Sequence, residues 1–332
     1  MNQDRHRKPI LVVGVPRSGT TWVANTLAQA PGTALLHEPD NEKQNILALR
    51  WKRNYHRMPH IEPSAEESVY LSFWRQILYE SYLPNRTVIN KTGFILMGLT
   101  DKKLEQYVQQ KCEKLTVNES DALPQLPSQF VTSFLSQSSF SYQKQRTKRR
   151  IVKSVHTGLT LPFISQHLSP EIVIVTRHPA SVVSSCIQLH LSDADRKVFR
   201  QRNLMEAHLN PFTRKIEESK ESVSAMALQT AIFYYVWEQE SKNHPHWYFM
   251  SHEALCEDPI AQFRSLYEKL HLDWMPSVEQ FLADHDQPGA GFQISRESST
   301  LADKWKQTLT PEQIDQVKKG YQTLPVHLYD DF

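Results

Sequence analysis

A short apolar run that ends in a tight, glycine-bearing turn constrains this fold more than any other feature of the sequence. Residues 9–13 predict a buried strand, the turn runs from Gly14 to Gly19, and a helix is predicted over residues 20–30. This order brings several free backbone N–H groups to one point, with the positive end of the helix dipole behind them. Such a point binds a phosphate.

Side chains in the same turn strengthen that expectation. Ser18, Thr20 and Thr21 offer hydroxyl donors, and Arg17 offers a planar cation that can form paired hydrogen bonds to an anion. The turn therefore predicts a phosphate site that has its own cation.

The turn differs from that of a nucleotide triphosphatase. Gly14 and Gly19 have the spacing of that loop, but Thr20 follows where those enzymes have lysine. A kinase or hydrolase would also need a magnesium-binding carboxylate after a later strand, and the strand predicted over residues 172–176 ends in Arg177. A P-loop kinase or hydrolase is thus the disfavoured alternative, and no metal site is expected.

Strands and helices alternate along the rest of the chain. Further strands are predicted over residues 34–36, 150–155, 172–176 and 247–250, and further helices over 159–168, 224–242 and 259–270 and from Pro179 and Pro311. The aromatic cluster Phe233, Tyr234, Tyr235 and Trp237 is interpreted as helix core. This alternation predicts an α/β fold with a doubly wound, mainly parallel sheet and a ligand at the carboxyl ends of the strands.

The domain organisation is predicted to be a single domain over residues 1–332. Residues 40–150 are expected to form a helical and polar insertion, with helix-like stretches at 66–82, 101–115 and 128–137. Residues 193–222 are highly charged with few apolar anchors and are a candidate lid. Both segments are where an acceptor would be bound.

Composition excludes several other classes of protein. The net charge of +2 gives no field suited to nucleic acid. Three scattered cysteines, at 112, 186 and 256, predict neither a disulfide framework nor a cysteine-rich metal site and indicate a cytoplasmic protein. No stretch approaches 18 apolar residues, so no membrane span is expected. The oligomeric state cannot be deduced from the sequence.

Two motifs resemble the sulfotransferase family that uses 3′-phosphoadenosine 5′-phosphosulfate (PAPS). The segment 16–22, Pro-Arg-Ser-Gly-Thr-Thr-Trp, is similar to its 5′-phosphosulfate loop, and Arg177 with Ser185 is similar to its 3′-phosphate pair. Two weaker matches follow: residues 251–259, with His252 in place of a tyrosine, and residues 295–299. The last match, with Trp305 after it, is nearer the tyrosylprotein and carbohydrate branches than the cytosolic small-molecule branch.

The resemblance implies a donor site and a P-loop-like fold. PAPS, with PAP as its product, would contact a set of residues along the chain: Arg17, Ser18, Gly19, Thr20, Thr21, Trp22, Arg177, Ser185 and Ser298. The 3′-phosphate contacts would separate PAPS from ATP.

The same resemblance implies the catalytic groups of a metal-independent in-line transfer. Arg17 would neutralise charge on the bridging oxygen, and Lys153 matches a lysine near the sulfate. Glu38 and His156 compete as the base, and Glu38 is favoured. The acceptor is a hydroxyl or amine of a small molecule, glycan or peptide. A catalytically silent PAP-binding protein remains a second alternative.

Overall fold

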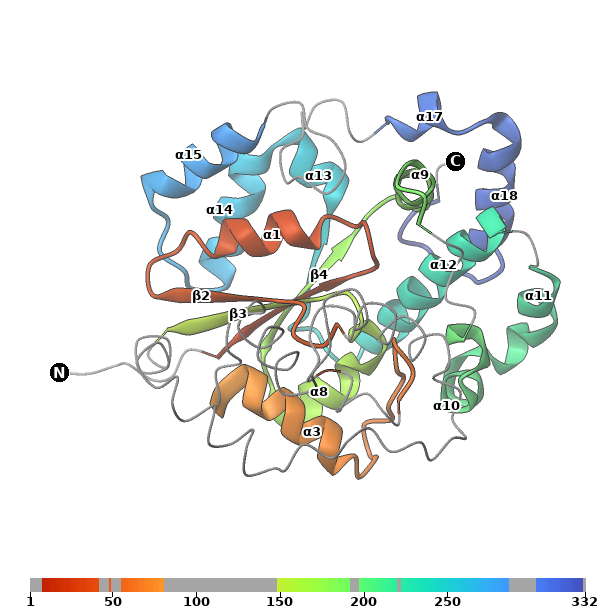
Figure 1. Ribbon diagram of the computed structural model, residues 1–332, viewed down its shortest axis with the longest axis horizontal. Coiled ribbons are helices and arrows are strands. Elements are labelled where there is room, and N and C mark those ends of the chain that lie inside the picture. The colour runs from red at the N-terminus through yellow and green to blue at the C-terminus, as the bar shows by residue number, and fades with distance from the viewer. Residues whose placement is uncertain are drawn as a thin grey trace, which may run out of the picture.

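A five-stranded parallel sheet forms the centre of the molecule (Figure 1). The computed structural model describes residues 8–41, 48, 55–80, 148–191, 197–219, 222–286 and 303–330. The strands are β1 (Ile10–Gly14), β2 (Thr33–His37), β3 (Arg149–Ser154), β4 (Glu171–Thr176) and β5 (Tyr248–Ser251). Their order is β2-β3-β1-β4-β5, and each neighbouring pair is parallel.

The sheet register aligns the carboxyl ends of the strands. Lys153 of β3 pairs with Val12 of β1 on one side and with His37 of β2 on the other. Thr176 of β4 pairs with Ser251 of β5. Because every pairing is parallel, the segments that follow the strands meet along one edge of the sheet.

Helices cover both faces of the sheet, so the predicted doubly wound α/β fold is confirmed (Figure 1). Along β1, Ile10 and Val12 pack into one buried cluster, whereas Leu11 and Val13 pack into the other. The strand is buried on both sides, which accounts for its unbroken apolar run. The helices named below are α1 (Thr20–Leu27), α3 (Ser68–Arg75), α8 (Leu161–Leu168), α9 (Pro179–Gln188), α12 (Ser222–Ser241), α13 (His252–Glu257), α14 (Pro259–Lys269), α15 (Pro276–His285), α17 (Trp305–Thr308) and α18 (Pro311–Tyr321).

The two faces carry different sets of helices. Helices α1, α14 and α15 lie on one face, around Phe263 and Tyr267. Helices α3, α8, α12 and α18 pack into the larger cluster on the other face, which includes Phe233 and Trp237. Phe233, Tyr234 and Trp237 are fully buried in α12, so their interpretation as helix core is confirmed.

The candidate lid is anchored to the larger core in its described part. Residues 197–219 contain the short helices α10 (Arg202–Leu204) and α11 (Thr213–Glu218), joined by a π-helix over Met205–Leu209 and a 3-10 turn over Asn210–Phe212. Val198, Leu204 and Leu209 are fully buried. Any lid movement would have to expose these side chains.

Part of the predicted insertion is described. Residues 68–80, at the start of the predicted 66–82 helix, form α3 and a π-helical turn over Gln76–Glu80, and Trp74 and Ile77 are buried. The stretches 101–115 and 128–137, the loop 295–299 with Ser298, and Cys112 lie outside the described residues. Across the described ranges, every helix is too short or too polar to cross a bilayer.

Candidate functional site

The turn after β1 folds around a left-handed backbone. Arg17 and Gly19 adopt φ angles of 73° and 96°, and the Ser18 amide donates to the Val15 carbonyl at 3.1 Å. Gly19 is the N-cap of α1 and makes no side-chain capping bond. The first amides of α1 therefore face the turn, where an anion can accept from them.

Close packing explains both glycines of the turn. A Cβ on Gly14 would lie 2.2 Å from the Ser18 Oγ and 2.6 Å from the Val175 carbonyl oxygen. A Cβ on Gly19 would lie 2.5 Å from Cδ2 of His252, the first residue of α13. The turn thus needs glycine at both positions, for space and at Gly19 also for its positive φ.

His252, which stands where the family has a tyrosine, is a buried support for this turn. Its ring lies edge-on to Trp22, with centroids 6.1 Å apart, and its Nδ1 is 3.5 Å from the Cys256 Sγ. Burial, and then the nearby Arg177 charge, hold the pKa of His252 well below 6.5. The ring is therefore neutral at physiological pH. Trp22 also packs edge-on against Phe263.

Arg177 meets the turn from the end of β4. Its Nη1 donates to the Arg17 carbonyl at 3.1 Å, and its Nε is buried without a hydrogen-bond partner. Burial lowers the pKa of Arg177, and the Glu253 carboxylate partly offsets this effect. The orphaned Nε and the partnerless, fully buried Ser18 Oγ both indicate a polar ligand, because such groups are costly to bury alone.

Ser185 of α9 contacts Arg17, the arginine whose carbonyl Arg177 also reaches. Its Oγ accepts from Arg17 Nε at 2.9 Å. The sequence pairs Ser185 with Arg177, whereas in the structure the Ser185 hydroxyl is bonded to Arg17. We call Arg17, Ser18, Arg177 and Ser185 the anion cluster.

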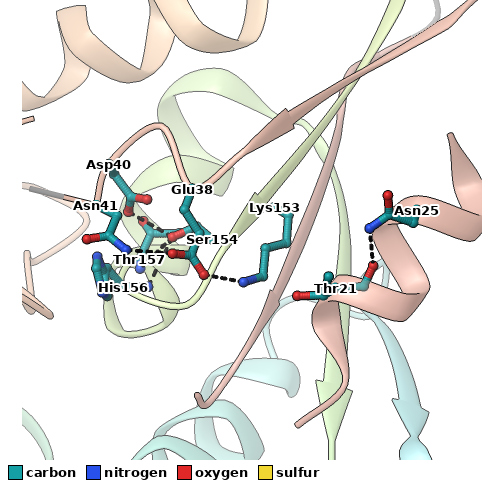
Figure 2. Close-up of polar contacts among 9 residues, drawn as sticks. All are labelled: Thr21, Asn25, Glu38, Asp40, Asn41, Lys153, Ser154, His156 and Thr157. Carbon is teal, nitrogen blue, oxygen red and sulfur yellow. Dashed lines mark hydrogen bonds and ion pairs between the residues drawn. The ribbon is translucent and has the colours of Figure 1, made fainter. Parts of the chain in front are cut away.

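Glu38 and Lys153 form a buried ion pair (Figure 2), and Lys153 is close enough to Arg17 of the anion cluster for the two charges to interact. Lys153 Nζ donates to Glu38 Oε1, and Asn41 Nδ2 donates to Glu38 Oε2 at 2.6 Å. The Glu38 amide donates to the Lys153 carbonyl at 2.8 Å, so β2 and β3 stay joined past the end of the ladder. Glu38 has a φ of 45°, which turns the chain at this point.

The charges of this pair reinforce each other. Burial raises the pKa of Glu38, but Lys153, Asn41 and His37 outweigh it, and the net pKa is lowered. Burial lowers the pKa of Lys153, Glu38 and Asp40 offset this only in part, Arg17 adds to it, and the net pKa of Lys153 is lowered. Glu38 is therefore a carboxylate at neutral pH, next to a lysine held in place by its charge.

His156 occupies the loop after β3 and is almost fully buried. Its amide and that of Thr157 donate to Ser154 Oγ at 3.0 and 3.2 Å, and Ser154 donates to Asp40 Oδ2 at 2.7 Å. In Figure 2 the ring lies near Asn41, on the opposite side of Glu38 from the Lys153 ammonium. Glu38, and not His156, makes the direct contact with Lys153.

Sequence reasoning missed Asp40, Asn41, Tyr234 and Glu253. Asp40 and Asn41 continue the polar run after β2, a signal that was available. Glu253 Oε1 accepts from the His178 amide at 2.9 Å, and Tyr234 contacts the Arg177 main chain. No local pattern links these residues to Arg177, because they come from other helices.

Within the described ranges, histidine, cysteine and carboxylate side chains form no group that could hold a metal ion.

Comparisons with known proteins give a family match. A family profile described as "Sulfotransferase family" matches residues 9–276. Comparison with curated protein sequences finds no match.

Similar solved structures are distant in sequence. The sulfotransferase domain of the Synechococcus PCC 7002 olefin synthase is 15% identical, covers 97% of each chain and has a TM-score of 0.42. Mouse sulfotransferase SULT7A1, solved with PAP, is 13% identical over 96% of this chain and 83% of its own, with a TM-score of 0.44. At such identities, neither substrates nor residue roles carry over from one chain to another.

Proposed function

This chain belongs to the sulfotransferase family, and we propose that it uses PAPS as donor and a hydroxyl or amine as acceptor. The observation that carries the donor assignment is the anion cluster, in which two arginines from different strand ends meet at a helix N-terminus. A donor with phosphates at both its 5′ and 3′ positions needs two such cations. The loop around Arg17 would hold the 5′ side, and Arg177 with Ser185 the 3′ side.

The residues of the cluster fit this ligand. Ser18 Oγ and Arg177 Nε are buried with unused hydrogen-bonding capacity, which phosphate oxygens would satisfy. Thr20, Thr21 and Trp22 continue along the first turn of α1, and Trp22 is proposed to lie near the adenine. Bound PAPS supplies the sulfuryl group, and PAP is the product.

Charge stabilisation would come from side chains that are already in position. Arg17 holds its charge beside the loop, fixed through Nε by Ser185, where negative charge on a leaving phosphate would collect. Lys153 supplies a second buried positive charge next to Glu38. We propose that these two cations replace a metal ion in the transfer, as preorganised electrostatic groups do.

Glu38 is the proposed base. Its lowered pKa keeps it ionised, so one carboxylate oxygen can accept the acceptor's proton. Asn41 and Lys153 fix the orientation of the carboxylate through hydrogen bonds to its two oxygens. A glutamate after the second strand is also a point in which the chain resembles the tyrosylprotein and carbohydrate branches, to which we propose that it is nearer. The acceptor class, small molecule, glycan or peptide, stays open.

Ligand-induced thermal stabilisation tests the donor. We expect PAP to raise the melting temperature more than AMP or Mg-ATP, because only PAP presents both phosphates without a metal. Arg177→Ala should weaken PAP binding at least about tenfold, since a charged hydrogen bond is worth about 1.5–3 kcal/mol. Arg264→Ala is the matched loss of an arginine, because Arg264 is half-exposed and pairs with Glu279 of α15, so it should leave the PAP effect intact.

The other outcomes identify the alternatives. Equal or greater stabilisation by Mg-ATP would indicate a phosphoryl-transfer enzyme and contradict the sulfotransferase proposal. PAP binding without turnover of labelled PAPS over a panel of hydroxyl and amine acceptors would indicate a silent PAP-binding protein.

A further inference from the structure

One hydroxyl group holds both main-chain groups of Arg177. Tyr234 Oη, from the middle of α12, accepts from the Arg177 amide at 2.8 Å and donates to the Arg177 carbonyl at 2.7 Å. A hydroxyl has one proton and two lone pairs, so both bonds can exist at once. The two residues are 57 positions apart in the chain.

Arg177 needs such a partner because of its place in the fold. Thr176 is the last residue of β4 and Pro179 the first of α9, so Arg177 lies outside both the sheet ladder and the helix. Its buried main-chain groups must be bonded elsewhere. The direction in which a side chain leaves the backbone follows from the backbone angles, and here the guanidinium reaches the carbonyl of Arg17.

Tyr234 is itself held rigidly. It is fully buried, and its ring packs against Trp237, Tyr321 and Tyr329 at centroid distances of 5.6, 6.3 and 6.0 Å. Burial raises the pKa of the phenol, so the hydroxyl keeps the proton that it donates. A rotation that moved the hydroxyl away from Arg177 would have to displace these rings.

A second connection supports the same region. Tyr329 Oη donates to Glu253 Oε2 at 2.8 Å, and the other oxygen of Glu253 accepts from the amide of His178, the neighbour of Arg177. The His178 ring stacks on Trp305 at 4.7 Å. His178, the residue that follows Arg177, is thus bonded to other elements.

We infer that Tyr234 is a positioning residue that aims the Arg177 guanidinium at the 3′-phosphate and so determines the preference for a 3′-phosphorylated donor. This inference rests on the proposed function for the identity of the donor. Tyr234 touches no ligand itself and acts through the backbone of Arg177. The phosphate on the 5′ side is held by the loop after β1, which Tyr234 does not contact, so a change at Tyr234 should affect one phosphate and not the other.

The test compares PAP with AMP, which lacks only the 3′-phosphate. Calorimetric titration of Tyr234→Phe should show PAP affinity reduced about tenfold and AMP affinity unchanged, because removal of the hydroxyl frees both main-chain groups of Arg177. Tyr267→Phe is the matched control: it also removes a buried phenol, which donates to the Thr26 carbonyl at 2.5 Å on the other face of the sheet. It should keep the wild-type ratio of PAP to AMP affinity.

The results separate this inference from the proposed function. If the wild type does not prefer PAP to AMP, the donor assignment is wrong. If it does, and Arg177→Ala removes the preference while Tyr234→Phe keeps it, the positioning role is wrong and the donor stands. An equal loss for PAP and AMP in Tyr234→Phe would show a merely structural role.

A measurement on the wild type covers the case in which Tyr234→Phe does not fold. The Arg177 amide should exchange with deuterium as slowly as the amides of β4, because it donates to a fully buried oxygen. Exchange as fast as that of the exposed termini would overturn the inference.

Discussion

Gly19 and Gly32 have similar backbone angles in very different surroundings. Their φ angles are 96° and 70°, but a Cβ on Gly19 would lie 2.5 Å from His252, whereas a Cβ on Gly32 would meet nothing within 4 Å. Comparing substitutions at these two glycines therefore separates the cost of the backbone angle from the cost of crowding at the turn after β1.

Gly19→Ala should therefore cost more than Gly32→Ala. A left-handed angle costs an L-residue about 1–2 kcal/mol, and forcing a methyl group into packed space adds about 1–3 kcal/mol. We expect Gly32→Ala to lose only the backbone-angle cost from its free energy of unfolding and to keep PAP binding. Gly19→Ala should lose both the backbone-angle cost and the crowding cost and should bind PAP poorly. Urea denaturation with PAP titration measures this, and equal losses in the two variants would contradict the crowding argument.

Among single residues, the sequence predicted some members of the candidate site and none of the contacts between them. Arg17, Ser18, Glu38, Lys153 and Arg177 were proposed as site residues because each lies at or just after a strand end, where position along the chain predicts position in the sheet. The ion pair between Glu38 and Lys153 was not foreseen, since it depends on β2 and β3 being neighbours. The contact of Tyr234 with Arg177 gives no periodic signal at all.

Among the elements, α18 is packed unusually closely against α12. Gly320, in the last turn of α18, would carry a Cβ only 2.1 Å from the carbonyl oxygen of Ser224 in α12. The start of α18 is stabilised by a capping box between Thr310 and Gln313. The sequence predicted this start from Pro311, but no sequence rule indicates the backbone contact at Gly320.

Gly320→Ala sets two opposing effects against each other. Alanine stabilises a helix by about 1 kcal/mol relative to glycine. Crowding against a backbone atom costs about 1–3 kcal/mol or more, because the main chain cannot change rotamer to relieve the contact as a side chain can. We expect a net loss of roughly 1–2 kcal/mol in thermal or urea unfolding. The exposed neighbour Lys318→Ala should stay within about 0.5 kcal/mol. If Gly320→Ala were more stable than the wild type, the gain in helix propensity would exceed the cost of crowding.

Prediction of elements succeeded where the apolar period was regular. The strands were located within about two residues because buried parallel strands are short apolar runs bounded by polar residues. The segment 197–219 was harder, because its buried anchors Val198, Leu204, Leu209 and Ile216 fit neither a strand nor a single helix. They are spread over short helices of different type.

At the scale of the whole molecule, histidines that are buried or half-buried make stability depend on pH. Burial lowers the pKa of His208, His244 and His252 from the ordinary 6.5, with His60, His246 and Arg177 adding to the respective effects. The unfolded chain therefore binds more protons than the folded one below about pH 6.5, and stability must fall as pH falls through that range. Above that pH range these histidines do not make the free energy of unfolding depend on pH.

His252→Gln should reduce this slope. The variant removes the histidine with the most strongly lowered pKa, so the loss of unfolding free energy between pH 7 and pH 5 should be smaller than in the wild type, even if the variant is less stable at pH 7. The control His327→Gln removes a side chain that is 78% exposed. Urea denaturation at several pH values gives both slopes, and identical slopes for wild type and His252→Gln would contradict the argument.

The bonds around Arg177 also have a consequence for how the chain is made. Arg177, Tyr234, Glu253 and Tyr329 are brought together from four regions, and the last of them lies near the carboxyl end of the sequence. During translation, the amino-terminal phosphate turn leaves the ribosome long before Tyr329 does. The full set of bonds around Arg177 can therefore form only after synthesis has passed residue 329.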